Sequence, residues 1–224
     1  MELKETIWRT IGVNLFKKRS LILAGILTEL QKELDDFHQY QPVESLLLDI
    51  GCGRGEFTKE VSKVFNISAI GINLNKHQVR DKKFDFLVAD GCRLPFKSQT
   101  FRIICAFSII EHINQNQRHA FYKEVCNVLD DSGIFLVQLS NRYFPIEQHS
   151  FLPFIGYLPE KLHSTFYHSF VSVPSKNVAL KQLHQNGFSI IVIIAYRMPV
   201  SILYKFLSTI IPFGYIIVAS KSLS

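Results

Sequence analysis

The residues best suited to do chemistry lie in the segment 46–57, which reads LLLDIGCGRGEF. Asp49 offers a carboxylate near the end of an apolar run, and three glycines come after it at alternate positions, Gly51, Gly53 and Gly55. Three successive leucines predict a strand that is buried on both faces. Glycines then allow turns that a side chain would forbid, and the apolar residues beyond them have helical spacing. The segment predicts a strand, a tight loop and a helix, a corner where bare backbone and the N–H groups of a helix start can approach a ligand.

Two phosphate-binding motifs do not fit this corner. A dinucleotide fingerprint needs a glycine at its sixth position, where this chain has Glu56, whose carboxylate would face a pyrophosphate badly. A P-loop needs Gly-Lys-Ser or Gly-Lys-Thr at its end, which is absent. An acid at the strand end followed by G-x-G-x-G instead resembles the first motif of the class I S-adenosylmethionine-dependent methyltransferases.

The resemblance implies S-adenosylmethionine as the cofactor and assigns roles to this segment. In that family the strand-end acid, which matches Asp49, helps to hold the methionine ammonium group. The glycines that match Gly51 and Gly53 line the carboxylate and sulfonium end, and Cys52 between them belongs to the same surface. A zwitterion is bound well between an anion and N–H donors, so the chemistry agrees with the resemblance.

Further matches lie at the ends of the next two apolar runs. The run 68–74 contains Asn73 where the family has an acid that binds the ribose hydroxyls. An amide lacks the charge-assisted strength of a carboxylate, a loss on the order of 1 kcal/mol, so Asn73→Asp is expected to tighten cofactor binding or leave it unchanged. Leu74 would then lie against the adenine. Asp90, followed by Gly91, matches the acid that accepts a hydrogen bond from the adenine amino group.

A fourth buried strand is expected over residues 103–110, with Glu111 and His112 at its carboxyl end. Phe107 lies in this strand and is assigned to the cofactor site. Ligands of open α/β sheets bind beyond the carboxyl ends of the strands. Family members often carry Glu-His here, beside the transferred methyl, which makes His112 a candidate catalytic residue. The structural alternative is that His112 caps the following helix or binds backbone.

The segment 141–159 is rich in aromatic residues and prolines and is too long for an ordinary connection, as functional loops often are. It resembles the stretch after the fifth strand in one branch of these methyltransferases, where Asn-Arg and Glu-x-His recur. The resemblance implies that Tyr143, Glu147 and His149 line the acceptor site, and that the last two could remove an acceptor proton. A loop pinned by buried prolines and aromatics is the alternative. Metal ligation by this pair lacks an evident third ligand.

The order of the elements predicts a Rossmann-like, doubly wound α/β fold with a seven-stranded sheet, mostly parallel with the last strand antiparallel, flanked by helices. We expect a methyltransferase domain over 41–224, with the loop insertion 141–159 and a helix over 200–211. An amino-terminal helical cap over 1–40 either covers the substrate pocket or packs against the sheet edge. Residues 130–133, Asp-Asp-Ser-Gly, are expected to end the helix before the fifth strand.

Composition limits the classes of protein further. The chain has 224 residues, 47% of them hydrophobic, which suits one domain with a sizeable core and argues against disorder. Four cysteines without a C-x-x-C pair favour a reduced, cytoplasmic protein. The apolar stretch 189–220 is interrupted by Arg197 and Lys205, and its last uninterrupted piece, 206–220, falls short of the roughly 20 residues of a membrane-spanning helix. The net charge of +6 is moderate.

The leading hypothesis is therefore an enzyme that transfers a methyl group from S-adenosylmethionine to a small-molecule or lipid-like acceptor. Nucleic acid is not indicated, because no basic stripe is interleaved with aromatics. A peripheral membrane contact and the oligomeric state are left open. One alternative is a catalytically silent methyltransferase-like binding subunit, which Asn73 favours. Another is a nicotinamide oxidoreductase, which Glu56 disfavours.

Overall fold

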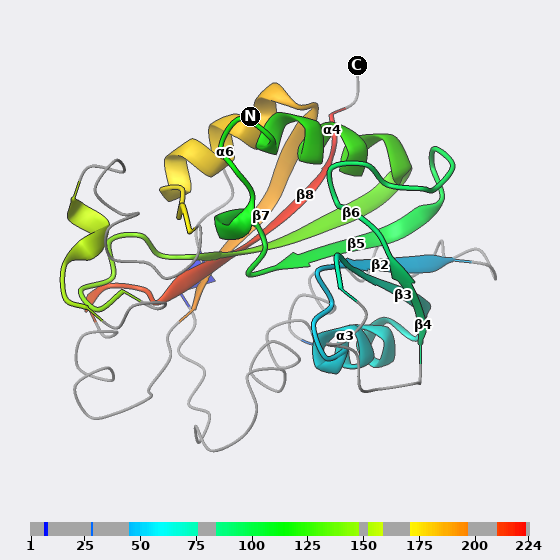
Figure 1. The fold of residues 1–224 in the computed structure, drawn as a ribbon, viewed down its shortest axis with the longest axis horizontal. Coiled ribbons are helices and arrows are strands. Elements are labelled where there is room, and N and C mark those ends of the chain that lie inside the picture. Colours follow the sequence, from blue (N-terminus) through cyan, green and yellow to red (C-terminus); the bar gives the residue numbers. More distant parts are fainter. Residues whose placement is uncertain are drawn as a thin grey trace.

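The computed structural model describes residues 7–8, 28, 45–75, 84–147, 152–158, 171–196 and 210–222. In these ranges a single mixed sheet carries helices on both faces (Figure 1). The strands are β1 (Ile7–Trp8), β2 (Leu46–Ile50), β3 (Ser68–Asn73), β4 (Asp85–Val88), β5 (Phe101–Phe107), β6 (Leu129–Ser140), β7 (Phe188–Tyr196) and β8 (Gly214–Lys221). The helices are α3 (Glu56–Phe65), α4 (Arg118–Val128) and α6 (Lys176–Gln185), with short 3-10 helices η2 (Ile110–His112) and η3 (Ile155–Tyr157).

The order of the strands across the sheet is β1-β7-β8-β6-β5-β2-β3-β4. β8 is antiparallel to both of its neighbours, and every other neighbouring pair is parallel. β2 to β8 are thus the predicted seven strands, six parallel and the last antiparallel, so the predicted Rossmann-like fold is confirmed. β1 adds a two-residue strand at the edge beside β7.

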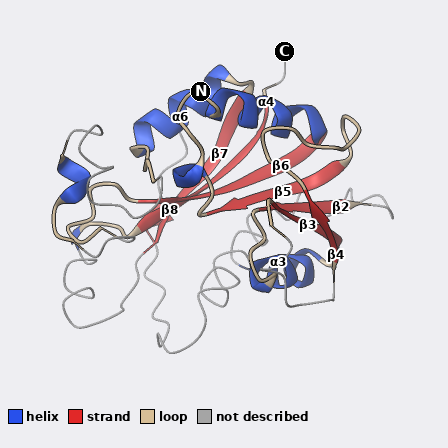
Figure 2. Ribbon diagram, in the orientation of Figure 1, coloured by secondary structure: helices blue, strands red, loops and turns tan. Residues whose placement is uncertain are grey.

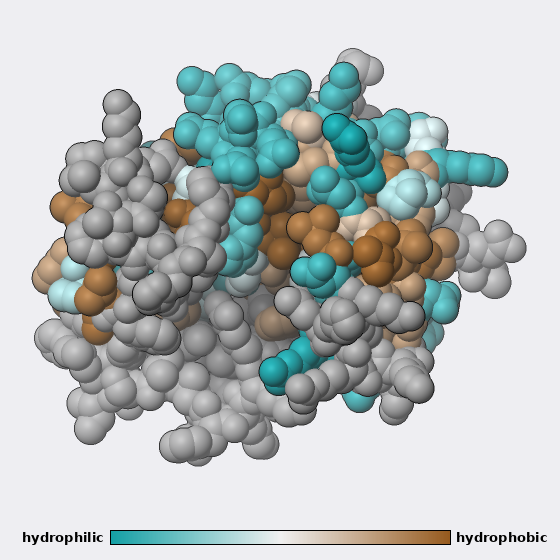
Figure 3. All heavy atoms as spheres, in the orientation of Figure 1, coloured by the Kyte–Doolittle hydropathy of each residue, from teal (hydrophilic) through white to brown (hydrophobic). Residues whose placement is uncertain are grey.

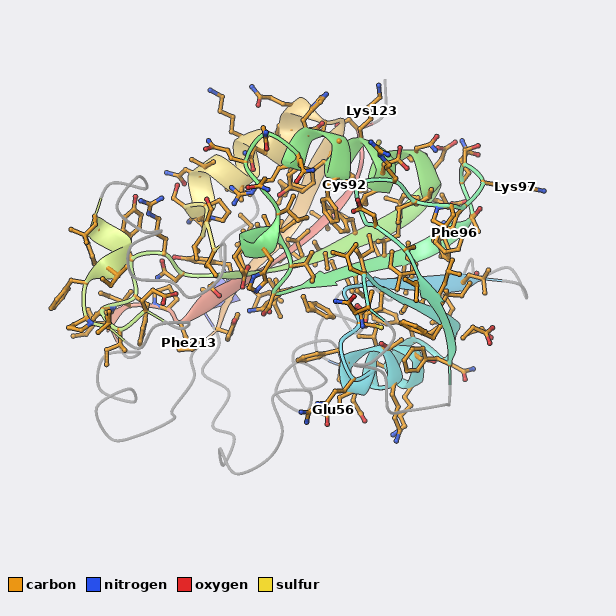
Figure 4. All side chains as sticks on the ribbon, in the orientation of Figure 1. Glu56, Cys92, Phe96, Lys97, Lys123 and Phe213 are labelled. Carbon is orange, nitrogen blue, oxygen red and sulfur yellow. The ribbon has the colours of Figure 1, made fainter. Side chains whose placement is uncertain are left out.

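Side chains alternate across the strands, so the sheet has two apolar faces. One face packs against α3 through Val61 and Phe65. The other packs against α4 and α6 through residues such as Val125 and Leu183 (Figure 2). The outer side of these two helices is hydrophilic (Figure 3). Figure 4 shows Lys123 on α4 directed away from the sheet, on the side opposite Glu56 at the start of α3.

The predicted corner between β2 and α3 is present. Leu47 and Leu48 are fully buried, and α3 begins at Glu56. Gly51 has a φ angle of +73°, which glycine adopts at little cost. A Cβ atom there would also lie 2.0 Å from Ile109 Cδ1, so both the backbone angle and the packing require glycine at this position.

The structure differs from the sequence-based elements at three points. The helical prediction for 1–40 is wrong at Ile7–Trp8, because the edge strand β7 offers backbone groups with which an extended segment pairs. β5 ends at Phe107 rather than at residue 110, since Ser108 takes a positive φ angle of 54° that a strand cannot continue. Thr28 is helical, and the rest of the expected cap lies outside the described residues.

The third difference concerns residues 130–133, which were expected to end the preceding helix. α4 stops at Val128, and β6 begins at once at Leu129, so these residues form an irregularity within the strand. The Asp130 carboxylate stabilises it by accepting hydrogen bonds from the Ser132 N–H at 2.9 Å and from Arg102 at 3.0 Å. The expected helix over 200–211 lies outside the described residues except at its last two positions, of which Ile210 is helical.

No helix in the described part of the chain has both the length and the apolar character needed to cross a membrane.

Candidate functional site

A pocket of about 250 Å³ lies at the carboxyl edge of the sheet, beyond β2, β3, β4 and β5. Its walls are mostly apolar, with side chains from Ile50, Ile72, Ile109, Ile113 and Phe121. Six of the residues predicted from the sequence line it together: Gly51, Asn73, Leu74, Asp90, Gly91 and His112. A largely apolar cavity with a few convergent polar groups is typical of a small-molecule site, and its position at this sheet edge is typical of α/β enzymes.

An apolar surface and a hydrogen-bond acceptor in this pocket suit a flat heterocycle. Leu74 is 69% exposed and offers an apolar surface against which a ring can lie. Asp90 supplies the acceptor group, and one of its carboxylate oxygens also accepts a hydrogen bond from the Cys92 N–H at 2.9 Å. Gly91, next to Asp90, packs closely against the end of β2, because a Cβ atom there would lie 2.9 Å from Ile50 Cγ2.

The glycine loop beside the pocket is anchored to the end of β3. The N–H groups of Gly51 and Cys52 both donate to the Ile72 carbonyl, at 2.8 and 3.1 Å. These two donors are therefore used inside the protein and are not directed to a ligand. Gly53 has a φ angle of +55°, and nothing lies within 4 Å of the position that its Cβ atom would occupy. The loop thus presents open space at Gly53.

Asp49 lies on the other side of β2 from the pocket-lining Ile50 and faces α3. Its side chain is buried, and the Thr58 hydroxyl donates to it at 2.6 Å. Burial raises the pKa of this carboxyl from 3.8 to about 7, and the Thr58 hydrogen bond opposes the rise. None of the salt bridges among the described residues involves Asp49. A buried carboxylate without a counter-charge is a candidate for receiving a cationic group.

The other residues assigned to the cofactor do not line the pocket. Cys52 is buried, and burial followed by the nearby Asp49 charge raises the pKa of its thiol to about 12, so it is not a nucleophile. Phe107 is buried on the α3 face, where its ring centroid lies 5.4 Å from that of Phe57. Gly53 lies beside the pocket rather than in its wall.

The loop after β6 contains the remaining candidates. Glu147 is buried, its N–H donates to the Leu152 carbonyl at 3.0 Å, and it does not line the pocket. His149 lies outside the described residues. Tyr143 is 46% exposed, and its ring packs against Tyr157 with centroids 5.4 Å apart. The loop is held together by Arg142, whose guanidinium donates to the carbonyls of residues 156 and 158 at 2.9 and 3.1 Å.

Sequence reasoning missed a largely buried hydrogen-bond chain that runs from Ser108, just after β5, through Gln138 in β6 to Tyr196 in β7. The Ser108 hydroxyl donates to Gln138 Oε1 at 2.7 Å, and Gln138 Nε2 donates to the Tyr196 hydroxyl. Ser108 has a positive φ angle, and the turn at this residue leads directly into the pocket-lining Ile109 and His112. The signal available in the sequence was Gln138, a single amide inside an apolar run.

Comparisons with known proteins find a related family and related sequences. Residues 48–137 match the family described as "Methyltransferase domain". A human protein named "Probable tRNA methyltransferase 9B" is 26% identical over 137 residues, which cover 58% of this chain and 30% of that protein. Norajmaline N-methyltransferase of Rauvolfia serpentina is 31% identical over 93 residues, 37% of this chain and 31% of the relative. The chain therefore spans less than a third of the length of these curated relatives.

The same fold occurs in solved structures. An S-adenosylmethionine-dependent methyltransferase from Methanosarcina mazei superposes with a TM-score of 0.60 at 21% identity, covering 84% of this chain and 98% of that one. The matches confirm the family predicted from the motifs. Residues 48–137 form a methyltransferase domain, on the fold of the class I S-adenosylmethionine-dependent methyltransferases.

Proposed function

We propose that this chain transfers a methyl group from S-adenosylmethionine to a small-molecule or lipid-like acceptor. The observation that carries the proposal is the convergence of Asn73, Leu74, Asp90 and His112 on one pocket at the carboxyl edge of the sheet. These residues come from separate strand ends, and the family match over 48–137 includes all of them. The family match does not favour the alternative of a catalytically silent subunit.

The residues present suit the two halves of this cofactor. Leu74 and Asp90 would hold the adenine, with the ring on the leucine and the amino group on the carboxylate. Gly51 and Gly53, with Cys52 and Phe107 behind them, would border the methionine half. Asp49 would hold the ammonium group, which supplies the counter-charge that this buried carboxylate lacks among the described residues.

The cofactor brings an activated methyl on a sulfonium, so the protein mainly has to orient and enclose the reactants. Proximity and alignment supply most of the acceleration in such an in-line displacement. Ser108 turns the chain so that Ile109 packs over Gly51 and His112 borders the pocket. We assign to His112 the positioning of the acceptor, and to Glu147 and His149 the removal of its proton where the acceptor carries one.

The acceptor class is inferred from the loop after β6. Four of its large apolar side chains are 40% or more exposed: Tyr143, Leu152, Phe154 and Tyr157. Such a surface suits an apolar acceptor better than a charged one. The relatives named above carry names that refer to tRNA and to an alkaloid, so both kinds of acceptor are included in the test. A cytoplasmic location is part of the proposal and is supported by four cysteines that are all free.

Calorimetry on the purified chain tests the proposal. S-adenosylmethionine and its demethylated product, S-adenosylhomocysteine, should bind at one shared site, and NAD and ATP should bind far more weakly. Equal or tighter binding of NAD would refute the cofactor. Incubation of metabolite extracts, lipid extracts and tRNA with methyl-labelled cofactor then identifies the acceptor. Label on tRNA alone would refute the small-molecule assignment and keep the methyltransferase.

A further inference from the structure

Asn73 is the last residue of β3 and lies where the resemblance led us to expect a ribose-binding acid. Its side chain is buried against the glycine loop that follows the neighbouring strand β2. The Gly53 N–H donates to Asn73 Oδ1 at 3.2 Å, and Asn73 Nδ2 donates to the Gly53 carbonyl at 3.1 Å. The amide group therefore binds both polar groups of one glycine residue.

The chemistry of this pair requires an amide. A backbone residue offers one donor and one acceptor, and only a side chain with both complements matches it. A carboxylate can accept from the Gly53 N–H, but it cannot donate to the Gly53 carbonyl. An aspartate at position 73 would lose one hydrogen bond and would direct a negative charge at a carbonyl oxygen. We therefore expect Asn73→Asp to weaken cofactor binding, in contrast to the sequence-based expectation that it tightens binding or leaves it unchanged.

The contact between Asn73 and Gly53 is one of several hydrogen bonds that hold the glycine loop against the end of β3. The Ile72 carbonyl accepts from the N–H groups of Gly51 and Cys52, and the Asn73 side chain then holds Gly53. Three successive loop residues are thus bound by two successive residues at the end of β3. Gly53 is held in a left-handed conformation, with open space where a Cβ atom would be. A ligand can approach the backbone closely at this point.

We propose that Asn73 is a positioning residue, which fixes Gly53 before the cofactor binds and sets the affinity for the amino-acid half of the cofactor rather than for its ribose. The inference rests on the proposed cofactor site. It predicts that the two halves of the ligand respond differently when residue 73 changes. A residue that binds the ribose would affect every ligand that carries the ribose hydroxyls.

Two ligands separate these roles. S-adenosylhomocysteine has both halves, whereas 5′-methylthioadenosine keeps the adenine and the ribose hydroxyls and lacks the amino acid. Asn73→Asp and Asn73→Ala should each lower the affinity for S-adenosylhomocysteine about tenfold in calorimetry. The affinity for 5′-methylthioadenosine should change by less than about twofold. Parallel changes for both ligands, or tighter binding by the Asp variant, would overturn the proposal.

Asn75→Asp is the matched control, because Asn75 lines the same pocket and the substitution adds the same charge. A clearly smaller loss of S-adenosylhomocysteine affinity in Asn75→Asp than in Asn73→Asp supports the proposal. Equal losses in the two Asp variants would mean that charge alone explains the effect, and would overturn it.

A measurement without ligand distinguishes this proposal from the proposed function. Amide hydrogen exchange, followed by NMR, should find the Gly53 N–H protected in the wild type and in Asn73→Asp, whose carboxylate still accepts. In Asn73→Ala the same N–H should exchange about tenfold faster or more, because its acceptor is gone. Equal exchange in the wild type and in Asn73→Ala would refute the positioning role. Protection of Gly53 in a wild type that binds no S-adenosylhomocysteine would refute the proposed function instead.

Discussion

The two faces of the sheet differ at their carboxyl edge. On the α4 and α6 face, the core residues nearest the carboxyl ends of β2 and β6 are Ile50 and Leu139, which are apolar. On the α3 face, the same strands carry Asp49, Gln138 and Ser140, all buried. A buried polar group destabilises the fold unless it is hydrogen-bonded, and a buried charge does so more strongly. The α4 and α6 face therefore combines an apolar core with the apolar wall of the pocket at its edge, whereas the α3 face contains buried polar groups that stability alone does not explain.

Tyr196 illustrates how the α3 face accommodates polar groups. Its hydroxyl accepts from Gln138, although β8 lies between β7 and β6. Gly214 in β8 makes this possible, because a Cβ atom there would lie 2.5 Å from the Tyr196 hydroxyl oxygen. The ring can therefore extend across β8 only over a glycine. This edge of the α3 face is thus shaped around a hydrogen-bond network, and substitutions on the two faces should have different consequences.

The largest effect is expected at Asp49. Asp49→Ala should abolish measurable binding of S-adenosylmethionine, because the ligand ammonium group would be buried without its counter-charge. Asp49→Asn keeps the shape and an acceptor for the Thr58 hydroxyl, and it should lose binding as well. Calorimetry on both variants, with circular dichroism to verify folding, provides the measurement. Binding at wild-type affinity by the Asn variant would show that this carboxylate does not hold the cation.

Substitutions in the core beneath α6, on the opposite face, should change stability alone. Leu183 on α6 is fully buried in the apolar core, and Leu183→Ala should lower the free energy of unfolding by about 3 kcal/mol. The affinity for S-adenosylhomocysteine should stay unchanged, since no residue of α6 lines the pocket. Urea unfolding and calorimetry on the same preparation test this. A loss of affinity in the folded variant would show that the core beneath α6 also supports the cofactor site.

Glu147 is a buried carboxyl in the loop after β6, in which Phe144 packs into the α3-side core. If Glu147 orients or deprotonates the acceptor, Glu147→Ala should lower turnover roughly 100-fold with little change in cofactor affinity. Glu147→Gln is the control, because it keeps the size and the hydrogen-bonding capacity and removes the charge. A purely structural role predicts a lower melting temperature in Glu147→Ala, rescue by Gln, and full turnover per folded molecule.

The fold and the cofactor edge could be predicted because their signals are local. The run at residues 46–50, the glycines after it and the helical spacing beyond Glu56 all lie within one short segment. The same holds for the strand ends at Leu74 and Asp90, which converge because the carboxyl ends of parallel strands share one edge.

The remaining features depend on pairs of residues that are distant in the sequence. Gly53 and Asn73 are 20 residues apart, and their contact follows from the register of β2 against β3. Gln138 and Tyr196 are 58 residues apart and meet only because β8 inserts between their strands. Strand alternation alone indicated that Asp49 and Ile50 face opposite sides, so the separation of this acid from the pocket was available to sequence reasoning and was not used.

The smallest expected effect is a dependence of stability on pH at Asp49. Burial raises the pKa of this carboxyl from 3.8 to about 7, so between these values the folded state binds a proton that the unfolded state has released. The free energy of unfolding contributed by this group therefore falls as the pH rises, by about 2 to 3 kcal/mol between about pH 5 and pH 8. Asp49→Asn cannot ionise and should not show this loss. In urea unfolding of the cofactor-free proteins, the free energy of unfolding of the variant should therefore rise relative to that of the wild type as the pH rises. If the free energies of unfolding of the two proteins changed in parallel with pH, the ionised Asp49 carboxylate would not destabilise the folded state or the α3 face.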